Sequence, residues 1–148
     1  MKDKKFTFNS NKAKEYFLEK ISFEMSPWQL KKHSDEKINS LNIIDVRNYE
    51  DYINGHIPFA THIPMDDLEE HIKMFEKDIV NIVYTYCNCC YKAAYAASII
   101  AENNYPVMVL CGGFKVWKEL GFDIIKTSDN AWFPSKVVFK YCKKAVYL

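Results

Sequence analysis

The segment IVNIVYTYCNCCYKAAYAASIIAE, residues 79–102, decides the fold of this chain. Residues 79–86 are mostly β-branched and aromatic, and a run of this length and apolarity is typical of a strand that is buried on both faces. Residues 93–102 are rich in alanine and predict a helix. The six residues between them, 87–92, then form a loop that opens with a cysteine and closes with a lysine.

This loop is a favourable place for a reactive thiol. Its N–H groups and the N-terminus of the helix that follows carry partial positive charge, and this charge stabilises an anion in the turn. The reactive form of cysteine is the thiolate, which is an anion. Cys87 is therefore a candidate nucleophile that this setting keeps ionised, and Lys92 adds a positive charge at the mouth of the loop.

Strands and helices alternate along most of the chain. Besides the central segment, the sequence predicts strands at 22–24, 41–46, 61–63 and 106–110 and helices at 27–32, 66–75 and 114–120. This alternation predicts an α/β fold with a mainly parallel sheet. We expect one domain over residues 21–125, an N-terminal extension with a short helix over 1–20, and a C-terminal tail over 126–148 that packs on or extends the domain.

Composition and charge limit the class of protein. A length of 148 residues suits a single core, and the balance of 20 Lys and Arg against 19 Asp and Glu gives a net charge of +1. This balance argues against nucleic acid or an anionic membrane as the main partner. Because no apolar run approaches the length of a membrane span and no apolar stretch follows the N-terminal lysines, we expect a soluble, cytoplasmic protein.

The number and spacing of the cysteines favour reduced thiols. The five residues are an odd set, and three of them fall within four positions: Cys87, Cys89, Cys90, Cys111 and Cys142. A secreted, disulfide-bonded domain would have an even number spread along the chain. We predict that the cluster is kept for chemistry and that Cys111 and Cys142 are structural.

The two ends of the chain lie outside this pattern. Residues 12–21 predict a short amphipathic helix that packs Tyr16 and Phe17 against the domain, with a partner-binding helix as the alternative. The tail is basic, because it contains five lysines beyond residue 125, at 126, 136, 140, 143 and 144. A solvated face or a docking site for an acidic protein partner would both explain these lysines.

Two further positions are candidates for supporting roles. Asp45 and Arg47 lie at the end of the predicted strand 41–46, where charge-assisted hydrogen bonds between them would hold the next loop. Ligand crevices form at the carboxyl ends of strands in such sheets, so we expect this pair to support the site rather than to take part in its chemistry. The histidines at 33, 62 and 71 have no motif around them and are expected at the surface or in packing.

Four stretches, in this order and spacing, resemble the rhodanese-like family, single-domain type: 43–47 (IIDVR), 55–60 (GHIPFA), 86–92 (YCNCCYK) and 112–117 (GGFKVW). The resemblance covers residues 21–125 and implies a three-layer sandwich with a central sheet of about five strands. In this family the first cysteine of the loop accepts a sulfane sulfur, becomes a persulfide, and passes the sulfur to a thiol or to cyanide. The resemblance therefore implies a sulfurtransferase with Cys87 as its catalytic residue.

The resemblance also implies partners and further site residues. Donors would be small sulfur anions such as thiosulfate or polysulfide, or a protein persulfide, the acceptor would be a thiol, a protein or cyanide, and no metal or organic cofactor is expected. Related phosphatases have a loop one residue longer that is closed by arginine, so Lys92 at the short-loop position favours sulfur transfer. His56 would frame its turn in a supporting role, and the candidate binding residues are Asn88, Cys89, Cys90, Tyr91 and Lys92.

Two departures from the family pattern keep alternatives open. Cys90 and Phe59 stand where the family usually has glycine, and a side chain there strains or reshapes a turn that needs positive φ. An alignment with a longer loop would make Cys90 the nucleophile in place of Cys87. The alternative function is a non-catalytic rhodanese-like module for binding or redox sensing.

The cysteine cluster itself allows three interpretations. In the first, Cys87 carries a persulfide while Cys89 or Cys90 faces outward or resolves the persulfide as a disulfide. In the second, the cluster binds a soft metal, although its spacing lacks the two separated pairs of a structural zinc site. In the third, some of the three cysteines are small buried packing residues, as free cysteines often are.

Overall fold

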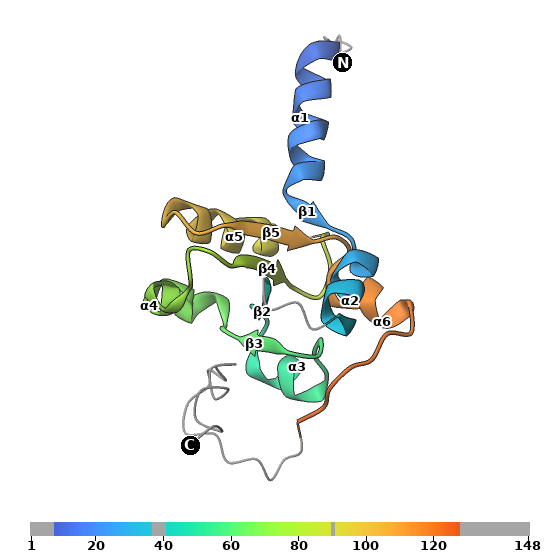
Figure 1. Cartoon of the computed structure of the whole chain (residues 1–148), viewed down its shortest axis with the longest axis vertical. Coiled ribbons are helices and arrows are strands. Elements are labelled where there is room, and N and C mark those ends of the chain that lie inside the picture. Colours follow the sequence, from blue (N-terminus) through green and yellow to red (C-terminus); the bar gives the residue numbers. More distant parts are fainter. Residues whose placement is uncertain (1–7, 37–40, 90, 128–148) are drawn as a thin grey trace, which may run out of the picture.

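A central parallel sheet organises the molecule (Figure 1). The computed structural model describes residues 8–36, 41–89 and 91–127, so that Cys90, Cys142 and the tail from residue 128 lie outside the described residues. Five strands pair in the order β1-β5-β4-β2-β3, and every pairing is parallel. The strands are β1 (Glu24–Met25), β2 (Leu41–Asp45), β3 (Ala60–His62), β4 (Val80–Tyr84) and β5 (Val107–Leu110). The predicted α/β fold with a parallel sheet of about five strands is confirmed.

Helices precede, connect and follow the strands. They are α1 (Ser10–Ser22), α2 (Pro27–Asp35), α3 (Tyr49–Asn54), α4 (Leu68–His71), α5 (Lys92–Glu102) and α6 (Gly113–Glu119). The helix predicted over 66–75 is instead a single turn, α4, between two short 3₁₀ segments, η1 (Met65–Asp67) and η2 (Ile72–Met74). Short 3₁₀ turns commonly begin and end a helix, and sequence periodicity does not separate them from it.

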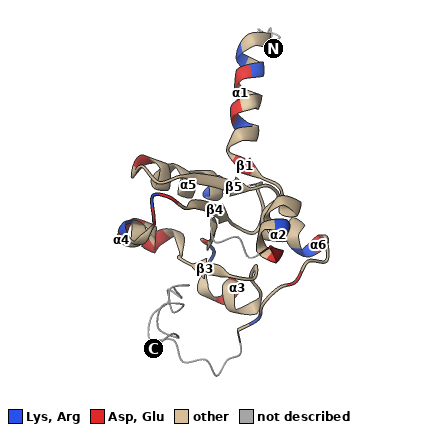
Figure 2. Ribbon diagram, viewed as in Figure 1, with Lys and Arg blue, Asp and Glu red and all other residues tan. Residues whose placement is uncertain are grey.

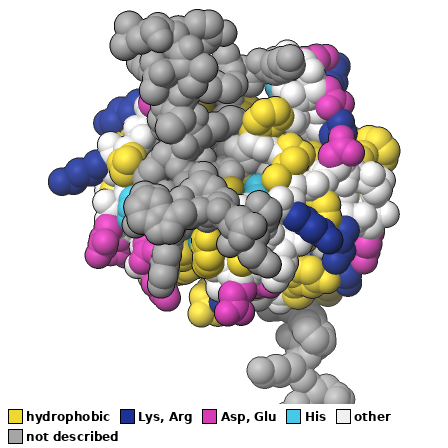
Figure 3. Space-filling model, turned by 90° about the horizontal axis from the view of Figure 1, so that it is seen from below, with side chains coloured by type: hydrophobic (Ala, Val, Ile, Leu, Met, Phe, Trp, Pro, Cys, Tyr) yellow, Lys and Arg dark blue, Asp and Glu magenta, His cyan; other side chains and the backbone are white. Residues whose placement is uncertain are grey.

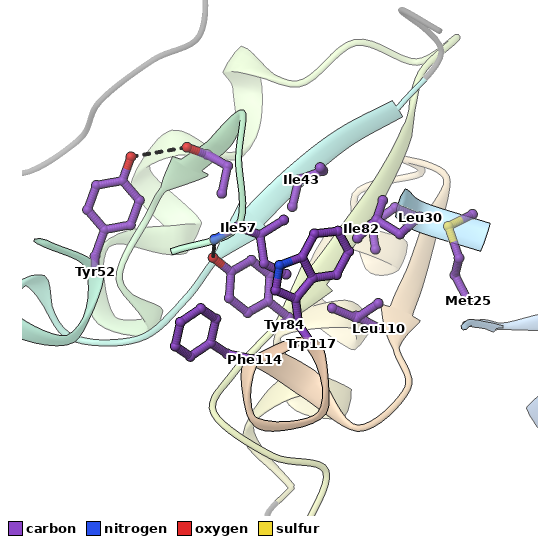
Figure 4. Close-up of a cluster of buried hydrophobic side chains, with 11 residues drawn as sticks. Met25, Leu30, Ile43, Tyr52, Ile57, Ile82, Tyr84, Leu110, Phe114 and Trp117 are labelled. Carbon is purple, nitrogen blue, oxygen red and sulfur yellow. Dashed lines mark hydrogen bonds between the residues drawn. The ribbon is translucent and has the colours of Figure 1, made fainter. Parts of the chain in front are cut away.

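Helices cover both faces of the sheet and form two cores. Successive residues of a strand point to opposite faces. Ile43 and Ile82 accordingly pack with residues of α2, α3 and α6, whereas Ile44 and Val83 pack with residues of α4 and α5. Figure 4 shows the first core, where Trp117 lies among side chains of the sheet and α2. The fold is therefore a three-layer sandwich.

The N-terminal helix contradicts one expectation. The side chains of Tyr16 and Phe17 are 59% and 57% exposed, so the prediction that they pack against the domain is wrong. Helix α1 extends away from the sheet and carries charges of both signs along its length (Figures 1 and 2). It leads into β1, a strand at the edge of the sheet that pairs with β5, and no residue of α1 is buried.

Charges of both signs lie on the face that Figure 3 shows. On the described part of the face in Figure 3, hydrophobic side chains lie among acidic and basic ones. Within the described ranges, no helix combines the length and the apolarity that crossing a bilayer requires.

Near the end of the described chain, Ile125 forms an antiparallel bridge with His56, and the Thr127 N–H donates to the Ile53 carbonyl at 2.9 Å. The start of the predicted tail thus lies against α3.

Candidate functional site

Three connections meet at the carboxyl edge of the sheet. Strands β5, β4 and β2 are neighbours and parallel, so the segments that follow them emerge side by side. Ligand crevices in α/β sheets form at this edge. The segment after β2 contains Arg47, the segment after β4 contains the cysteines, and the segment after β5 contains Gly112 and Gly113.

The cysteine loop joins β4 to α5. Thr85 is buried, and its hydroxyl donates a hydrogen bond to the Cys87 carbonyl at 2.9 Å. Cys87 is half-buried, whereas Asn88 and Cys89 are exposed. Cys87 and Cys89 form a disulfide with a Cα–Cα distance of 5.4 Å, so the prediction of reduced thiols is wrong for this pair, because two cysteines separated by one residue are close enough to bond. The loop therefore brings together two of the cysteines that the sequence marked, and the third, Cys90, lies outside the described residues.

Helix α5 begins at Lys92, the residue that was expected to close the loop. Its N-cap residue is Tyr91, whose side chain makes no capping hydrogen bond. The N–H groups of a first helical turn have no partners within the helix. Because Tyr91 does not cap them and the helix dipole is positive at this end, the start of α5 favours a negative charge.

The start of α6 is hydrogen-bonded to the segment that leads from β4 into the cysteine loop. The N–H groups of Phe114 and Lys115 donate to the carbonyls of Thr85 and Tyr86, at 2.9 and 2.7 Å. Gly113 has φ +62, and a Cβ at this position would lie 2.7 Å from the Thr85 carbonyl oxygen. Only glycine permits this close approach of the two backbones.

Asn88, one of the candidate binding residues, has a side chain that contacts the end of β5. The carboxamide lies between the Leu110 carbonyl oxygen and the Gly112 nitrogen. In the orientation that satisfies both groups, it donates to Leu110 at 3.2 Å and accepts from Gly112 at 3.0 Å. The side chain therefore anchors the loop to the end of β5, a contact that the sequence analysis did not predict.

A cavity of about 550 Å³ opens in front of the loop. Its lining comes from the segments after β2, β3 and β4 and from the start of α5. The lining residues are Val46, Arg47, Asn48, Asp51, Pro64, Met65, Asp66, Thr85, Tyr86, Cys87, Tyr91, Lys92 and Tyr95. The cavity thus brings Cys87 together with three tyrosines and with Lys92, and it is large enough for a small ligand.

The charges that line the cavity are of both signs. Among the described lining residues, Arg47 and Lys92 are cationic and Asp51 and Asp66 are anionic. Arg47 is paired with Asp45, whereas the exposed Lys92 lies at the N-terminus of α5. Lys92 is therefore better placed than Arg47 to attract an anion to the cavity.

Asp45 and Arg47 form a buried network. Nε and Nη2 of Arg47 donate to both carboxylate oxygens of Asp45 at 2.6 to 3.1 Å, and Nη2 also donates to the Gly55 carbonyl at 2.7 Å. Burial alone lowers the pKa of Arg47, but the hydrogen bonds and charge of Asp45 outweigh it and raise that pKa. The pair ties the segment after β2 to the turn that begins at Gly55, as expected for a supporting group.

Tyr84 completes this network, and the sequence analysis did not identify it. Its hydroxyl donates to Oδ2 of Asp45 at 2.7 Å. It also accepts from the Ile57 N–H at 3.2 Å, the contact that Figure 4 shows. Burial raises the pKa of Tyr84 well above its ordinary value, so the hydroxyl stays protonated and can donate. Asp45 and Tyr84 are partners in the β2–β4 register, but that register becomes known only from the structure.

His56 frames the turn between α3 and β3. Its ring stacks on Tyr52 with centroids 3.8 Å apart, and Nδ1 lies 2.8 Å from the Tyr52 carbonyl, to which it donates. Burial lowers the pKa of His56, although the hydrogen bond to the Tyr52 carbonyl opposes this effect. His56 is absent from the cavity lining and bonds to backbone, a geometry that fits support. His62, which was expected to be at the surface or in packing, is fully buried.

Phe59 occupies the strained position that the sequence suggested. The Ala60 N–H donates to the Ile57 carbonyl at 3.0 Å, which closes a β-turn with Pro58 and Phe59 at its centre. Phe59 has φ +66, in the left-handed region, and its side chain is 50% exposed. Such a turn ordinarily has glycine at this position.

Cys111 lies directly after β5, outside the cysteine loop. Cys111 is exposed, so its thiol has no packing role in a core, contrary to the structural role that was predicted. Over residues 8–36, 41–89 and 91–127, no group of three or more His, Cys, Asp or Glu side chains is arranged to hold a metal ion.

Known proteins with similar sequences include sulfurtransferases. Thiosulfate sulfurtransferase GlpE of Coxiella burnetii (strain RSA 331) is 30% identical over 94 residues, which are 64% of this chain and 82% of that protein. Thiosulfate sulfurtransferase PspE of Escherichia coli is 33% identical over 72 residues, 49% of this chain and 69% of PspE. A probable molybdopterin-synthase adenylyltransferase of Pyropia yezoensis is 25% identical over 105 residues, 68% of this chain but only 27% of that protein.

Solved structures with similar folds include two bacterial proteins. The BH2092 protein from Bacillus halodurans has a TM-score of 0.73 and 28% identity, over 85% of this chain and 96% of its own. A full-length protein from Lactobacillus plantarum has a TM-score of 0.75 at 15% identity, over 80% of this chain and 99% of its own, and this likeness shows the fold alone. The family model for the rhodanese-like domain matches residues 26–120, and this chain therefore belongs to the rhodanese-like family.

Proposed function

We propose that the protein is a sulfurtransferase that moves a sulfane sulfur atom through a persulfide on Cys87. The observation that carries the proposal is the position of Cys87 in the loop between β4 and α5. There it lines a cavity of about 550 Å³, next to the N-terminus of a helix. Family membership and relatives named as thiosulfate sulfurtransferases support the same class of activity.

The first step is an attack on the donor. With thiosulfate, the Cys87 thiolate attacks the outer sulfur, the sulfur–sulfur bond of thiosulfate breaks, and sulfite leaves with the electron pair. Cys87 then carries a persulfide anion. The partial positive charge at the start of α5 and the ammonium of Lys92 favour both the thiolate and the persulfide, because both are anions.

The second step returns the enzyme to its starting state. A thiolate or cyanide attacks the terminal sulfur of the persulfide, and Cys87 leaves as a thiolate. The acceptor becomes a persulfide or thiocyanate. A small thiol would reach the terminal sulfur through the cavity, and a protein acceptor would present its thiol at the cavity mouth.

The Cys87–Cys89 disulfide favours a second candidate function, a redox-sensing module that does not turn over. Closing this bond removes the thiolate that sulfur transfer needs. In such a module an oxidant such as hydrogen peroxide would close the bond, and a thiol reductant would open it.

Sulfite release separates the two functions. Reduced protein is incubated with thiosulfate, and sulfite and thiocyanate are measured without and with cyanide. We expect one sulfite per chain without an acceptor, continued thiocyanate formation with cyanide, and neither product from Cys87→Ser. Cys111→Ser is the matched control, because this exposed thiol is not part of the cavity lining, and it should behave as wild type. No sulfite from the wild type, with a Cys87–Cys89 disulfide formed by peroxide, would favour the sensing module.

A further inference from the structure

We propose that Cys89 is a resolving cysteine, which converts the Cys87 persulfide into the Cys87–Cys89 disulfide and releases its terminal sulfur as sulfide. This inference rests on the proposed function, because it starts from the persulfide. It adds a second activity to the same loop, a reductive release of sulfide from the sulfur donor.

The geometry of the loop permits this reaction. The sulfur atoms of Cys87 and Cys89 are bonded in this structure, across one intervening residue and a Cα–Cα distance of 5.4 Å. That separation lies within the usual range for a disulfide. The Cys89 sulfur can therefore reach the inner sulfur of a persulfide on Cys87.

The loop anchors do not involve either sulfur. The Thr85 hydroxyl bonds to the Cys87 carbonyl, and the Asn88 carboxamide bonds to the end of β5 and to Gly112. These contacts are present with the disulfide closed. Opening the disulfide therefore breaks neither of these two anchoring contacts directly.

The two thiols also differ in access. Cys87 is half-buried and lines the cavity, whereas Cys89 is exposed and, among the described residues, does not belong to that lining. A donor would enter the cavity and load Cys87. An external thiol would reach the disulfide from the Cys89 side, and exposed disulfides are the ones that are readily reduced.

The chemistry balances without an outside oxidant. The Cys89 thiolate attacks the inner sulfur of the persulfide, the bond between that sulfur and the terminal sulfur breaks, and hydrosulfide leaves with the electron pair. The sulfane sulfur is reduced and the two cysteines are oxidised. A low-molecular-weight thiol or a dithiol protein then reduces the disulfide, so that thiosulfate and two thiols give sulfite, sulfide and one disulfide.

A single turnover without added thiol tests the inference. Protein is reduced, freed of reductant, mixed with one equivalent of thiosulfate, and followed by sulfide assay and intact mass. Wild type should release one sulfide per chain and lose the mass of two hydrogens. Cys89→Ser should gain the mass of one sulfur atom. It should also release about tenfold less sulfide than wild type, because the resolving thiol is absent.

The controls distinguish each way of failing. Cys111→Ser should match wild type, and Cys89→Ala should match Cys89→Ser. If wild type and Cys89→Ser both keep the added sulfur, Cys89 does not resolve the persulfide and the proposed function stands. If sulfide release survives in Cys89→Ser but is lost in Cys90→Ser, the resolving residue is Cys90 and the proposal is wrong. If neither chain releases sulfite nor gains sulfur, the proposed function fails as well.

Discussion

The connections after β2 and β4 lie side by side at one edge of the sheet, and they use their reactive groups in opposite ways. At the end of β2, Asp45 and Arg47 are buried and bonded to each other and to the backbone. After β4, Cys87 is half-buried and Cys89 is exposed. The difference teaches that the buried ion pair of this site maintains its shape, whereas the proposed chemistry depends on a loop that is open to solvent.

The largest effect on stability should come from the β2 side. Asp45→Ala leaves the Arg47 guanidinium buried without its partner, and this should lower the free energy of unfolding by about 3–5 kcal/mol. Urea unfolding followed by circular dichroism measures the loss. The matched control is Asp51→Ala, an exposed carboxylate of the cavity, which should stay within about 0.5 kcal/mol of wild type. Equal losses in the two variants would contradict the contrast.

The contact that holds the cysteine loop should rank second. Gly113→Ala places a Cβ 2.7 Å from the Thr85 carbonyl in a left-handed residue, and we expect a loss of about 2 kcal/mol together with slower sulfur transfer. Gly121→Ala is the matched control, because Gly121 is also left-handed, with φ +73, but has open space around it. It should cost about 1 kcal/mol and leave transfer unchanged. Normal transfer by Gly113→Ala would show that the start of α6 does not position the loop.

The positive charge of Lys92, at the end of the loop after β4, is expected to attract the sulfur donor. Lys92→Gln removes a cation from the cavity lining, and the KM for thiosulfate should rise about fivefold with little change in stability. Lys73→Gln removes an exposed lysine elsewhere and should leave the KM unchanged. An unchanged KM in Lys92→Gln would mean that this charge does not attract the donor.

Phe59 allows a gain in stability. Phe59→Gly removes the cost of a left-handed φ but adds the entropy of glycine in the unfolded chain, so we expect a net gain of about 0.5–1 kcal/mol in the free energy of unfolding. Phe59→Ala keeps a Cβ at the same φ and should show no such gain. A gain in Phe59→Ala equal to that in Phe59→Gly would assign the effect to the exposed ring instead.

The burial of His56 predicts that the free energy of unfolding depends on pH. Because burial lowers its pKa, the unfolded chain binds the proton more readily than the folded chain. The stability that neutral His56 contributes is complete above about pH 6.5 and is lost as the pH falls through its lowered pKa. His56→Gln should flatten unfolding free energy between about pH 7 and pH 5. A wild-type slope that persists in His56→Gln would contradict this role of His56.

The sequence predicted the sheet because its strands are β-branched runs with little polar interruption. It also placed Asp45 and Arg47 at a strand end, where the structure finds them bonded. It did not predict the Tyr84 hydroxyl beside Asp45, because that contact depends on the register between β2 and β4, which are far apart in the chain.

Two further differences have physical reasons. An amphipathic pattern shows that Tyr16 and Phe17 share a helix surface, but it does not say whether the same chain covers that surface, and here they are exposed. Three cysteines within four positions show that thiols are close, but the spacing alone does not say which pair bonds. The anchoring of Asn88 depends on the neighbouring β5 end, and no local signal in the loop indicates it.

The most direct test of the account is to locate the sulfur that the protein accepts. Cys89→Ser protein is loaded with thiosulfate, its persulfide is trapped by alkylation, and the digested chain is sequenced by tandem mass spectrometry. The account predicts the additional sulfur on Cys87. Sulfur on Cys90 or Cys111, or on no residue at all, would contradict it.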